Sequence, residues 1–120
     1  MGGMTDRRSP RPQLPHHRLV AYHVALELLH VVKAAEIRDA KLRDQAMRAA
    51  KSAALNIAEA AGRTSPADRA RVFAIARGEA MEAAAAVEIA ALAGDADGAA
   101  FDACLPVADR LVALLTGLCR

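Results

Sequence analysis

The chain is 120 residues long, 54% hydrophobic and 2% aromatic, with a formal net charge of +2 and two cysteines. These values exclude a disulfide framework, and no uncharged apolar stretch reaches the roughly 18 residues of a membrane span. Alanine, the commonest hydrophobic residue, is the strongest helix former and a poor strand former, so we expect an all-α protein. Its small side chain buries little area, so a single bundle of this size is expected to be marginal alone and to self-associate.

Residues 1–17 hold glycines, prolines, arginines and histidines without an apolar pattern, so we predict a disordered tail there and one domain over residues 18–120. The tail arginines are not followed by the uninterrupted apolar run of a signal peptide. Cys104 and Cys119 lie 15 residues apart on one expected helix, roughly 22 Å along its axis, too far to bond to each other. We therefore expect a reduced, cytoplasmic protein.

Apolar residues at helical spacing predict the first two helices, at about residues 18–36 and 39–61. Asp39 fits the N-cap of the second helix, and Gly62 fits the C′ position that ends it. Seven polar residues form one continuous stripe along this helix: Lys41, Gln45, Arg48, Ser52, Asn56, Glu59 and Arg63. Two apolar stripes also run along it, one through Leu42 and Ile57 and one through Met47 and Ala54, which is typical of a helix with neighbours on two sides.

The third helix begins with Ser65 as N-cap and Pro66 at the first helical position, and ends with Gly94 at C′. In its middle, Gly78 costs about 1 kcal/mol relative to alanine, and either a close helix crossing or chance explains it. Asp97 is the predicted N-cap of the last helix, which runs to about residue 118 and includes Pro106, a residue that would kink it or mark a late start. The short connections predict one antiparallel, up-down four-helix bundle.

The second helix also carries a motif. Its segment Gln45–Arg63 resembles the signature of the protein family named after 23S rRNA intervening sequences, Q-x-R-R-A-A-x-S-x-x-x-N-I-A-E-G-x-G-R. The most specific part is the run Asn56–Glu59 followed by Gly62-Arg63, and the resemblance covers about residues 18–120. Further matching positions are Ser65, Arg71, Ile75, Ala76, Gly78, Glu82 and Gly94. Met47 replaces an arginine of the signature, which weakens an inherited basic surface.

The resemblance implies a four-helix bundle that assembles into a ring-like homopentamer. A related group serves as the accessory protein of diversity-generating retroelements, where a basic pentameric barrel binds a reverse transcriptase and nucleic acid. By this analogy, the expected partners are further copies of the chain, together with RNA, DNA or a nucleic-acid enzyme such as a reverse transcriptase. No membrane partner is expected.

Polar residues of the second and third helices are expected to form a structural seam that fixes helix register in an alanine-rich bundle. The predicted members of this polar seam are Arg48, Ser52, Asn56, Glu59, Arg71 and Glu82. A binding role for the same side chains is the alternative interpretation.

Charge is segregated along the chain. Residues 38–77 hold nine Lys/Arg and four Asp/Glu, a net +5, whereas residues 78–120 hold two Lys/Arg and seven Asp/Glu, a net −5. Three interpretations stay open: a basic face for nucleic acid, complementarity between subunits, or an ordinary solvated surface. The candidate nucleic-acid contacts are Lys41, Arg43, Lys51, Arg63 and Arg69, with Arg48, Arg7, Arg8 and Arg11 as further members.

Chemistry-bearing motifs are missing from the sequence. His16, His23 and His30 are seven residues apart, about 10.5 Å along a helix, too far to share one metal ion. We expect no catalytic residue, no metal site and no cofactor, and hence no enzyme. Two functions are therefore predicted: a homo-oligomeric, nucleic-acid-associated accessory protein that binds phosphate backbones through a basic face, or a homo-oligomeric protein–protein scaffold without a nucleic-acid role.

Overall fold

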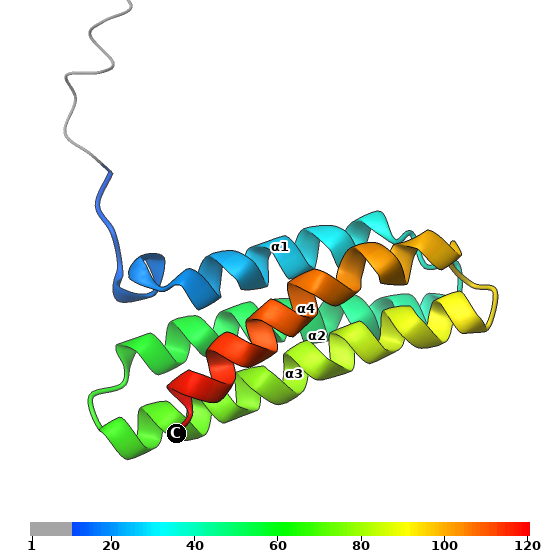
Figure 1. Cartoon of the computed structure of the whole chain (residues 1–120). Coiled ribbons are helices and arrows are strands. Elements are labelled where there is room, and N and C mark those ends of the chain that lie inside the picture. The colour runs from blue at the N-terminus through cyan, green and yellow to red at the C-terminus, as the bar shows by residue number, and fades with distance from the viewer. Residues whose placement is uncertain (1–10) are drawn as a thin grey trace, which may run out of the picture.

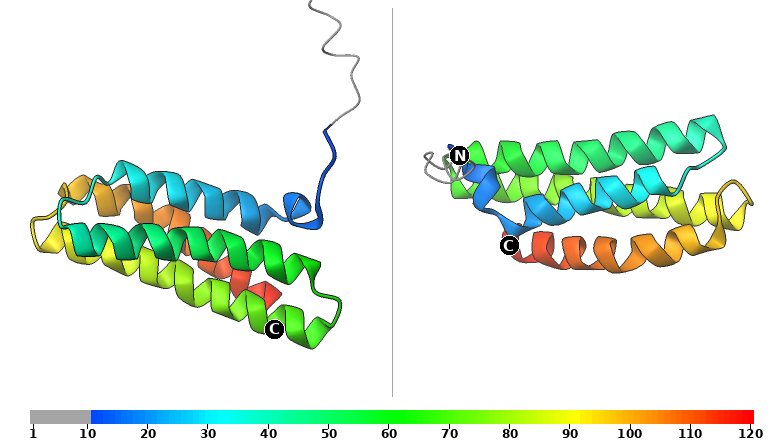
Figure 2. Two further views of the ribbon diagram at one scale, coloured as in Figure 1. Left: turned by 180° about the vertical axis from the view of Figure 1, so that it is seen from behind. Right: turned by 90° about the horizontal axis from the view of Figure 1, so that it is seen from above.

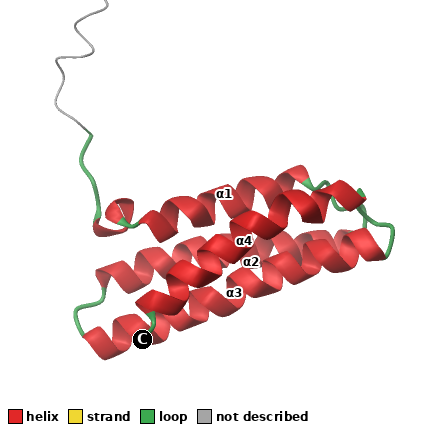
Figure 3. Cartoon of the chain, in the orientation of Figure 1, coloured by secondary structure: helices red, strands yellow, loops and turns green. Residues whose placement is uncertain are grey.

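The computed structural model describes residues 11–120, and residues 1–10 of the predicted tail lie outside this range. A short 3-10 helix and four α-helices follow one another: η2 (Pro15–Arg18), α1 (Val20–Ala34), α2 (Ala40–Gly62), α3 (Pro66–Leu92) and α4 (Gly98–Leu118). The described part of the chain contains no strand, which confirms the all-α prediction (Figure 1; Figure 3).

Consecutive helices run antiparallel and pack side by side as a bundle (Figure 1; Figure 2). The contact between α2 and α3 is the most extensive, that between α3 and α4 comes next, and α1 closes the bundle against both α2 and α4. The predicted four-helix bundle is thus confirmed. Its assembly into a ring stays a prediction.

The helix starts follow the predicted capping residues. The Asp39 carboxylate accepts a hydrogen bond from the Leu42 backbone N–H at 2.9 Å, and Asp97 accepts one from the Ala99 N–H at 3.1 Å. Ser65 Oγ accepts one from the third residue of α3, at 3.3 Å. Each cap supplies a partner to an N–H that the helix itself leaves unpaired.

The helix ends differ from each other. Gly94 has a φ of +82°, so the predicted left-handed C′ position after α3 is confirmed. The same prediction for Gly62 is wrong, because Gly62 is the last helical residue of α2 and Arg63 leaves the helix in an extended conformation. The chain needs no left-handed residue there, since the cap of α3 follows two residues later. After α1, Glu36 takes the left-handed conformation, with φ +46°.

The N-terminal boundary also differs from the prediction. The helix expected from Arg18 begins at Val20, because Pro15–Arg18 forms the separate 3-10 helix η2 and Leu19 is extended. This turn packs on α1 and α2, and His16 and His17 in it are half-buried. The last residues of the predicted tail are therefore folded onto the bundle.

Pro106 lies well inside α4, so the predicted late start of that helix is wrong. Proline lacks the N–H that would bond the carbonyl of Asp102, one turn earlier. Both residues are exposed, so water can supply the missing donor.

The core is built mainly from alanine. Nine alanines of α2 and α3 are no more than 2% exposed: Ala46, Ala49, Ala50, Ala53, Ala60, Ala76, Ala80, Ala83 and Ala90. Small side chains let two helix axes approach closely, which explains the extensive α2–α3 contact. The largest fully buried side chains are Leu28, Ile57, Leu111 and Leu115. No polar or charged side chain of the described residues is buried.

Candidate functional site

The predicted polar seam is divided into separate local contacts. Asn56 Nδ2 donates to the backbone oxygen of Ser52 at 2.9 Å and to its hydroxyl at 3.0 Å, both one turn earlier in α2. These two residues are half-buried. Their bonds lie within one helix and do not fix its register against α3.

Glu59 and Arg71 belong to a second cluster, at the turn between α2 and α3. Arg63 pairs with Glu59 and, at 3.0 Å, with Asp68. Arg71 donates to the other oxygen of Asp68 through Nε at 3.1 Å and through a terminal nitrogen at 2.9 Å. Asp68 thus joins the start of α3 to the end of α2, and its negative charge also suits the N-terminus of a helix.

The charges of this cluster shift its pKa values. Hydrogen bonds from Arg71 hold the pKa of Asp68 below its usual range, and Arg63 adds to the effect although partial desolvation opposes it. The pKa of Arg63 is raised above its usual value, first by the hydrogen bond to Glu59 and then by Asp68. The cluster is a structural clamp on the turn, and its members are too exposed to form a buried site.

Arg48 and Glu82 complete the predicted polar seam but do not join it. Both are exposed, and neither makes a hydrogen bond or an ion pair with the described part of the chain. The six residues therefore do not form one buried network within a single chain. The reason is packing: alanines fill the space between α2 and α3 and leave the polar stripe at the surface.

The candidate nucleic-acid contacts fall into two groups. Three of them already bond within the chain: Arg43 donates to the Ile37 carbonyl at 3.2 Å, Arg69 donates to the carbonyl of Arg63 at 3.1 Å, and Arg63 pairs with Asp68 at 3.0 Å. Lys41 and Lys51 are exposed and make no hydrogen bond or ion pair with the described residues. Arg7 and Arg8 lie outside the described residues, and Arg11 is exposed.

The outward side of α2 carries a mixed row of exposed residues, which we call the α2 outer row. Its members are Lys41, Asp44, Arg48, Lys51 and Leu55. Leu55 is 70% exposed, an unusual position for a leucine in the middle of a helix. Lys51 precedes it by one turn and Arg48 by two turns, so the leucine stands beside two cations on one side of the helix.

The outward side of α3 carries a row of exposed apolar and small residues, which we call the α3 outer face. Its members are Ala74, Ile75, Gly78, Met81, Ala85, Ile89 and Leu92, and the exposed charged residues Arg71, Glu82 and Glu88 lie beside them. Leu92 is 83% exposed and Ile89 51%. A Cβ built on Gly78 meets no atom within 4 Å, so the predicted close helix crossing does not occur within this chain.

A groove runs beside this face between α3 and α4, with a volume of about 270 Å³. The α3–α4 groove is lined by Met81, Ala84, Ala85, Glu88, Phe101, Leu105, Ala108, Asp109 and Val112. Its floor and walls are apolar, and its two charged residues are both acidic. Sequence periodicity gave no signal for it, because the groove depends on how far α3 and α4 stand apart.

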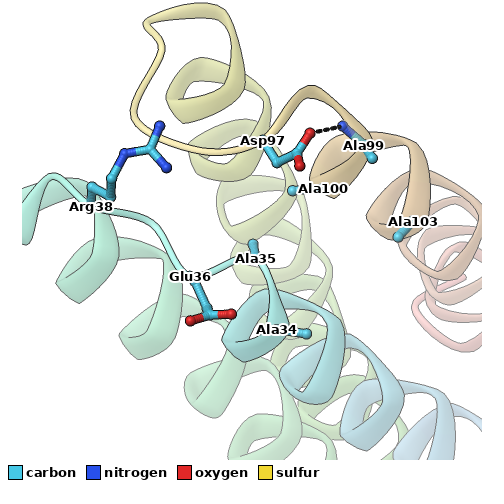
Figure 4. A pocket seen from close by; sticks show the side chains of 8 residues that line it. All are labelled: Ala34, Ala35, Glu36, Arg38, Asp97, Ala99, Ala100 and Ala103. Atoms are coloured by element: carbon cyan, nitrogen blue, oxygen red, sulfur yellow. Dashed lines mark hydrogen bonds between the residues drawn. The ribbon is translucent and has the colours of Figure 1, made fainter.

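A depression of about 550 Å³ lies at the end of the bundle where the α1–α2 and α3–α4 connections meet (Figure 4). Its charged residues are engaged in the connections: Arg38 donates to the Gly94 carbonyl at 2.6 Å, and Asp97 caps α4. Figure 4 shows that the side chains of Glu36, Arg38 and Asp97 do not converge on a common point. The depression therefore forms where the two connections pack together, and Arg38 and Asp97 stabilise those connections.

Three of the four histidines, His16, His17 and His23, lie in or next to η2. The rings of His16 and Tyr22 meet edge to face at 4.6 Å, and His23 Nε2 lies 2.8 Å from the His17 carbonyl. Partial burial lowers the pKa of His17, and the neighbouring positive groups, which include Arg11, lower it further. Among residues 11–120, no three His, Cys, Asp or Glu side chains are placed to hold a metal ion.

Cys104 and Cys119 are both free, and burial raises the pKa of the Cys104 thiol, which favours the neutral form over the thiolate. No helix in the described range has the length and apolar character needed to cross a membrane.

Comparison with known proteins agrees with the motif in α2. The sequence model of the 23S rRNA-intervening sequence protein family matches residues 19–117, which include all four helices but for the last residue of α4. A search of curated proteins gives no match to the chain. The predicted resemblance is confirmed, and the chain belongs to the family of 23S rRNA-intervening sequence proteins.

Proposed function

We propose that this chain is a non-enzymatic bundle that assembles with copies of itself and acts as a protein–protein scaffold. The observation that carries the proposal is the α3 outer face, where four large side chains are exposed: Ile75, Met81, Ile89 and Leu92, at 44–83% of their full exposure. Contiguous apolar surface of this kind marks an interaction site on a soluble domain, because water disfavours it.

Copies of the same chain are the best partners for this face. The core of one chain consists largely of alanine, and each alanine buries little area, so a single bundle gains limited stability from its own packing. Gly78 is compatible with such a partner, since it is exposed and a Cβ built on it meets no atom of the chain within 4 Å, so a helix of another copy has room to approach there. The family resemblance favours a ring-like homopentamer.

The test compares two matched substitutions. Ile89→Glu places a charge on the α3 outer face, whereas Val20→Glu places one on an exposed apolar residue of α1, outside both that face and the α3–α4 groove. The proposal expects size-exclusion chromatography to show a smaller assembly for Ile89→Glu and an unchanged one for Val20→Glu, with equal helix content in both. Unchanged assembly of Ile89→Glu would contradict it.

A second candidate function is binding to nucleic-acid phosphates, as an accessory protein beside a nucleic-acid enzyme such as a reverse transcriptase. It is favoured by the α2 outer row, in which Lys41, Arg48 and Lys51 are exposed and make no bond within the described chain. A single chain offers few such cations, and a ring would repeat them. Three of the five predicted contacts are engaged in internal bonds, which is why we place this candidate second.

Fluorescence anisotropy with single-stranded and duplex oligonucleotides tests the second candidate. Phosphate contacts predict binding that ignores sequence and weakens steeply as salt rises from about 50 to 200 mM, because affinity then comes from counterion release. Binding that persists at the higher salt, or prefers one sequence, would show a different mechanism. No binding at about 50 mM salt would leave the scaffold function alone.

A further inference from the structure

We propose that the α2 outer row of one copy docks into the α3–α4 groove of the next copy, with Leu55 as the apolar anchor. This inference rests on the proposed self-assembly and specifies its contact. Two features of the molecule are otherwise unexplained by the bundle: a leucine in mid-helix that is 70% exposed, and an apolar groove of about 270 Å³ that no segment of the described chain fills.

The shapes of the two surfaces support this pairing. Leu55 projects from the outward side of α2, and the groove walls include two apolar side chains that are themselves half exposed, Met81 at 49% and Leu105 at 50%. A leucine seated between them would remove all three from water at once. A helix laid along the groove would also cover Ala85, whose small side chain leaves room for close approach.

The charges of the two surfaces are opposite in sign, which also supports the pairing. The α2 outer row holds three cations and one acid, a net +2, and the two charged residues of the groove, Glu88 and Asp109, make −2. Lys51 and Arg48 stand one and two turns before Leu55, so both are carried to the groove when the leucine enters it. Complementary charges around an apolar anchor orient a contact and reject the wrong partner more than they strengthen it.

The two surfaces lie on different sides of the bundle. Figure 1 shows α3 and α4 toward the viewer, and the rear view in Figure 2 brings α2 forward. A contact between two different surfaces is head-to-tail, so an open assembly keeps one free surface of each kind, one at each end, until a ring closes. The contact would also cover Lys51, so the assembled α2 outer row could not offer that lysine to a phosphate.

Blocking each surface separately tests the pairing. Leu55→Glu blocks the anchor, since a carboxylate is repelled by Glu88 and Asp109. The double substitution Met81→Gln and Leu105→Gln removes the apolar walls of the groove without adding charge. All three positions are exposed in the single chain, so the fold should survive, and far-UV circular dichroism checks it.

We expect each variant alone to self-associate about 10- to 100-fold more weakly than the wild type, which is the effect of removing one buried leucine-sized contact. Mixed one to one, the two variants still hold one intact anchor and one intact groove between them. The mixture should therefore form a heterodimer of twice the 12.6 kDa chain mass and stop there. Val20→Glu, at another exposed apolar residue, is the matched control and should assemble like the wild type.

The outcomes separate this inference from the proposed function. A monomeric wild type would overturn both. A wild type that assembles, together with a Leu55→Glu variant that assembles equally well, would overturn the inference and leave self-assembly standing. A mixture of the two blocked variants that stays monomeric would overturn the head-to-tail pairing.

Discussion

Ala80 lies at the centre of α3, is fully buried, and belongs to the alanines that let α2 and α3 pack closely. Replacing it with leucine adds three carbon atoms, whose burial would favour folding by roughly 2.4 kcal/mol at about 0.8 kcal/mol for each CH₂ if space existed. Ala80 is 0% exposed and lies among the packed alanines of α2 and α3, so we expect no room for that gain. Forcing the side chain in costs about 1–3 kcal/mol instead.

Urea unfolding at fixed protein concentration measures the change, since assembly makes the stability depend on concentration. Each kcal/mol lost also lowers the melting temperature by about 4–8 °C in a domain of up to roughly 100 residues. Ala113→Leu is the control, because Ala113 is exposed and both residues are good helix formers, so we expect a change within about 0.5 kcal/mol. An Ala80→Leu variant as stable as the wild type would refute the close alanine packing of α2 against α3.

Three further predictions follow from single features of the fold. Leu111→Ala removes a fully buried side chain and should lower the free energy of unfolding by about 2–5 kcal/mol in urea, and a loss below about 1 kcal/mol would contradict the assigned core. The pKa of Asp68 is lower in the folded state, so the stabilising effect of its ion pairs is present above the ordinary value of 3.8 and is lost as the pH falls below it. Between pH 6 and pH 3 the melting temperature should therefore decline less for Asp68→Asn than for the wild type. An equal decline would show that Asp68 does not stabilise the turn between α2 and α3. Gly94→Ala should destabilise by about 1–2 kcal/mol because of its positive φ, whereas Gly78→Ala in a dissociated chain should stabilise by about 0.5–1 kcal/mol, and the reverse order in thermal unfolding would contradict both assignments.

Local signals predicted the elements of the fold well. Alanine content and helical spacing indicated four helices, and the caps Asp39, Ser65 and Asp97 act as their sequence context predicts. These features depend on a few neighbouring residues, so the sequence contains them. Gly62 was assigned wrongly because a glycine after a helix permits a left-handed end without requiring one.

The candidate site could be predicted only in part. Residue types and periodicity identified the polar stripe of α2, but they did not tell whether Arg48 and Asn56 face a neighbouring helix or the solvent. That depends on the rotation of α2 about its axis, which the alanines set through packing. The same limit applies to the α3–α4 groove, whose width comes from two helices that are distant in sequence from Leu55.

We propose that this member of the 23S rRNA-intervening sequence protein family assembles with itself through surfaces that one bundle leaves exposed. Sedimentation equilibrium of the wild-type chain at several micromolar concentrations checks this proposal, because the method gives mass without assuming a shape. We expect a stable mass that is a whole multiple of 12.6 kDa, with five copies favoured by the family resemblance. A single species of 12.6 kDa across the whole concentration range would contradict it.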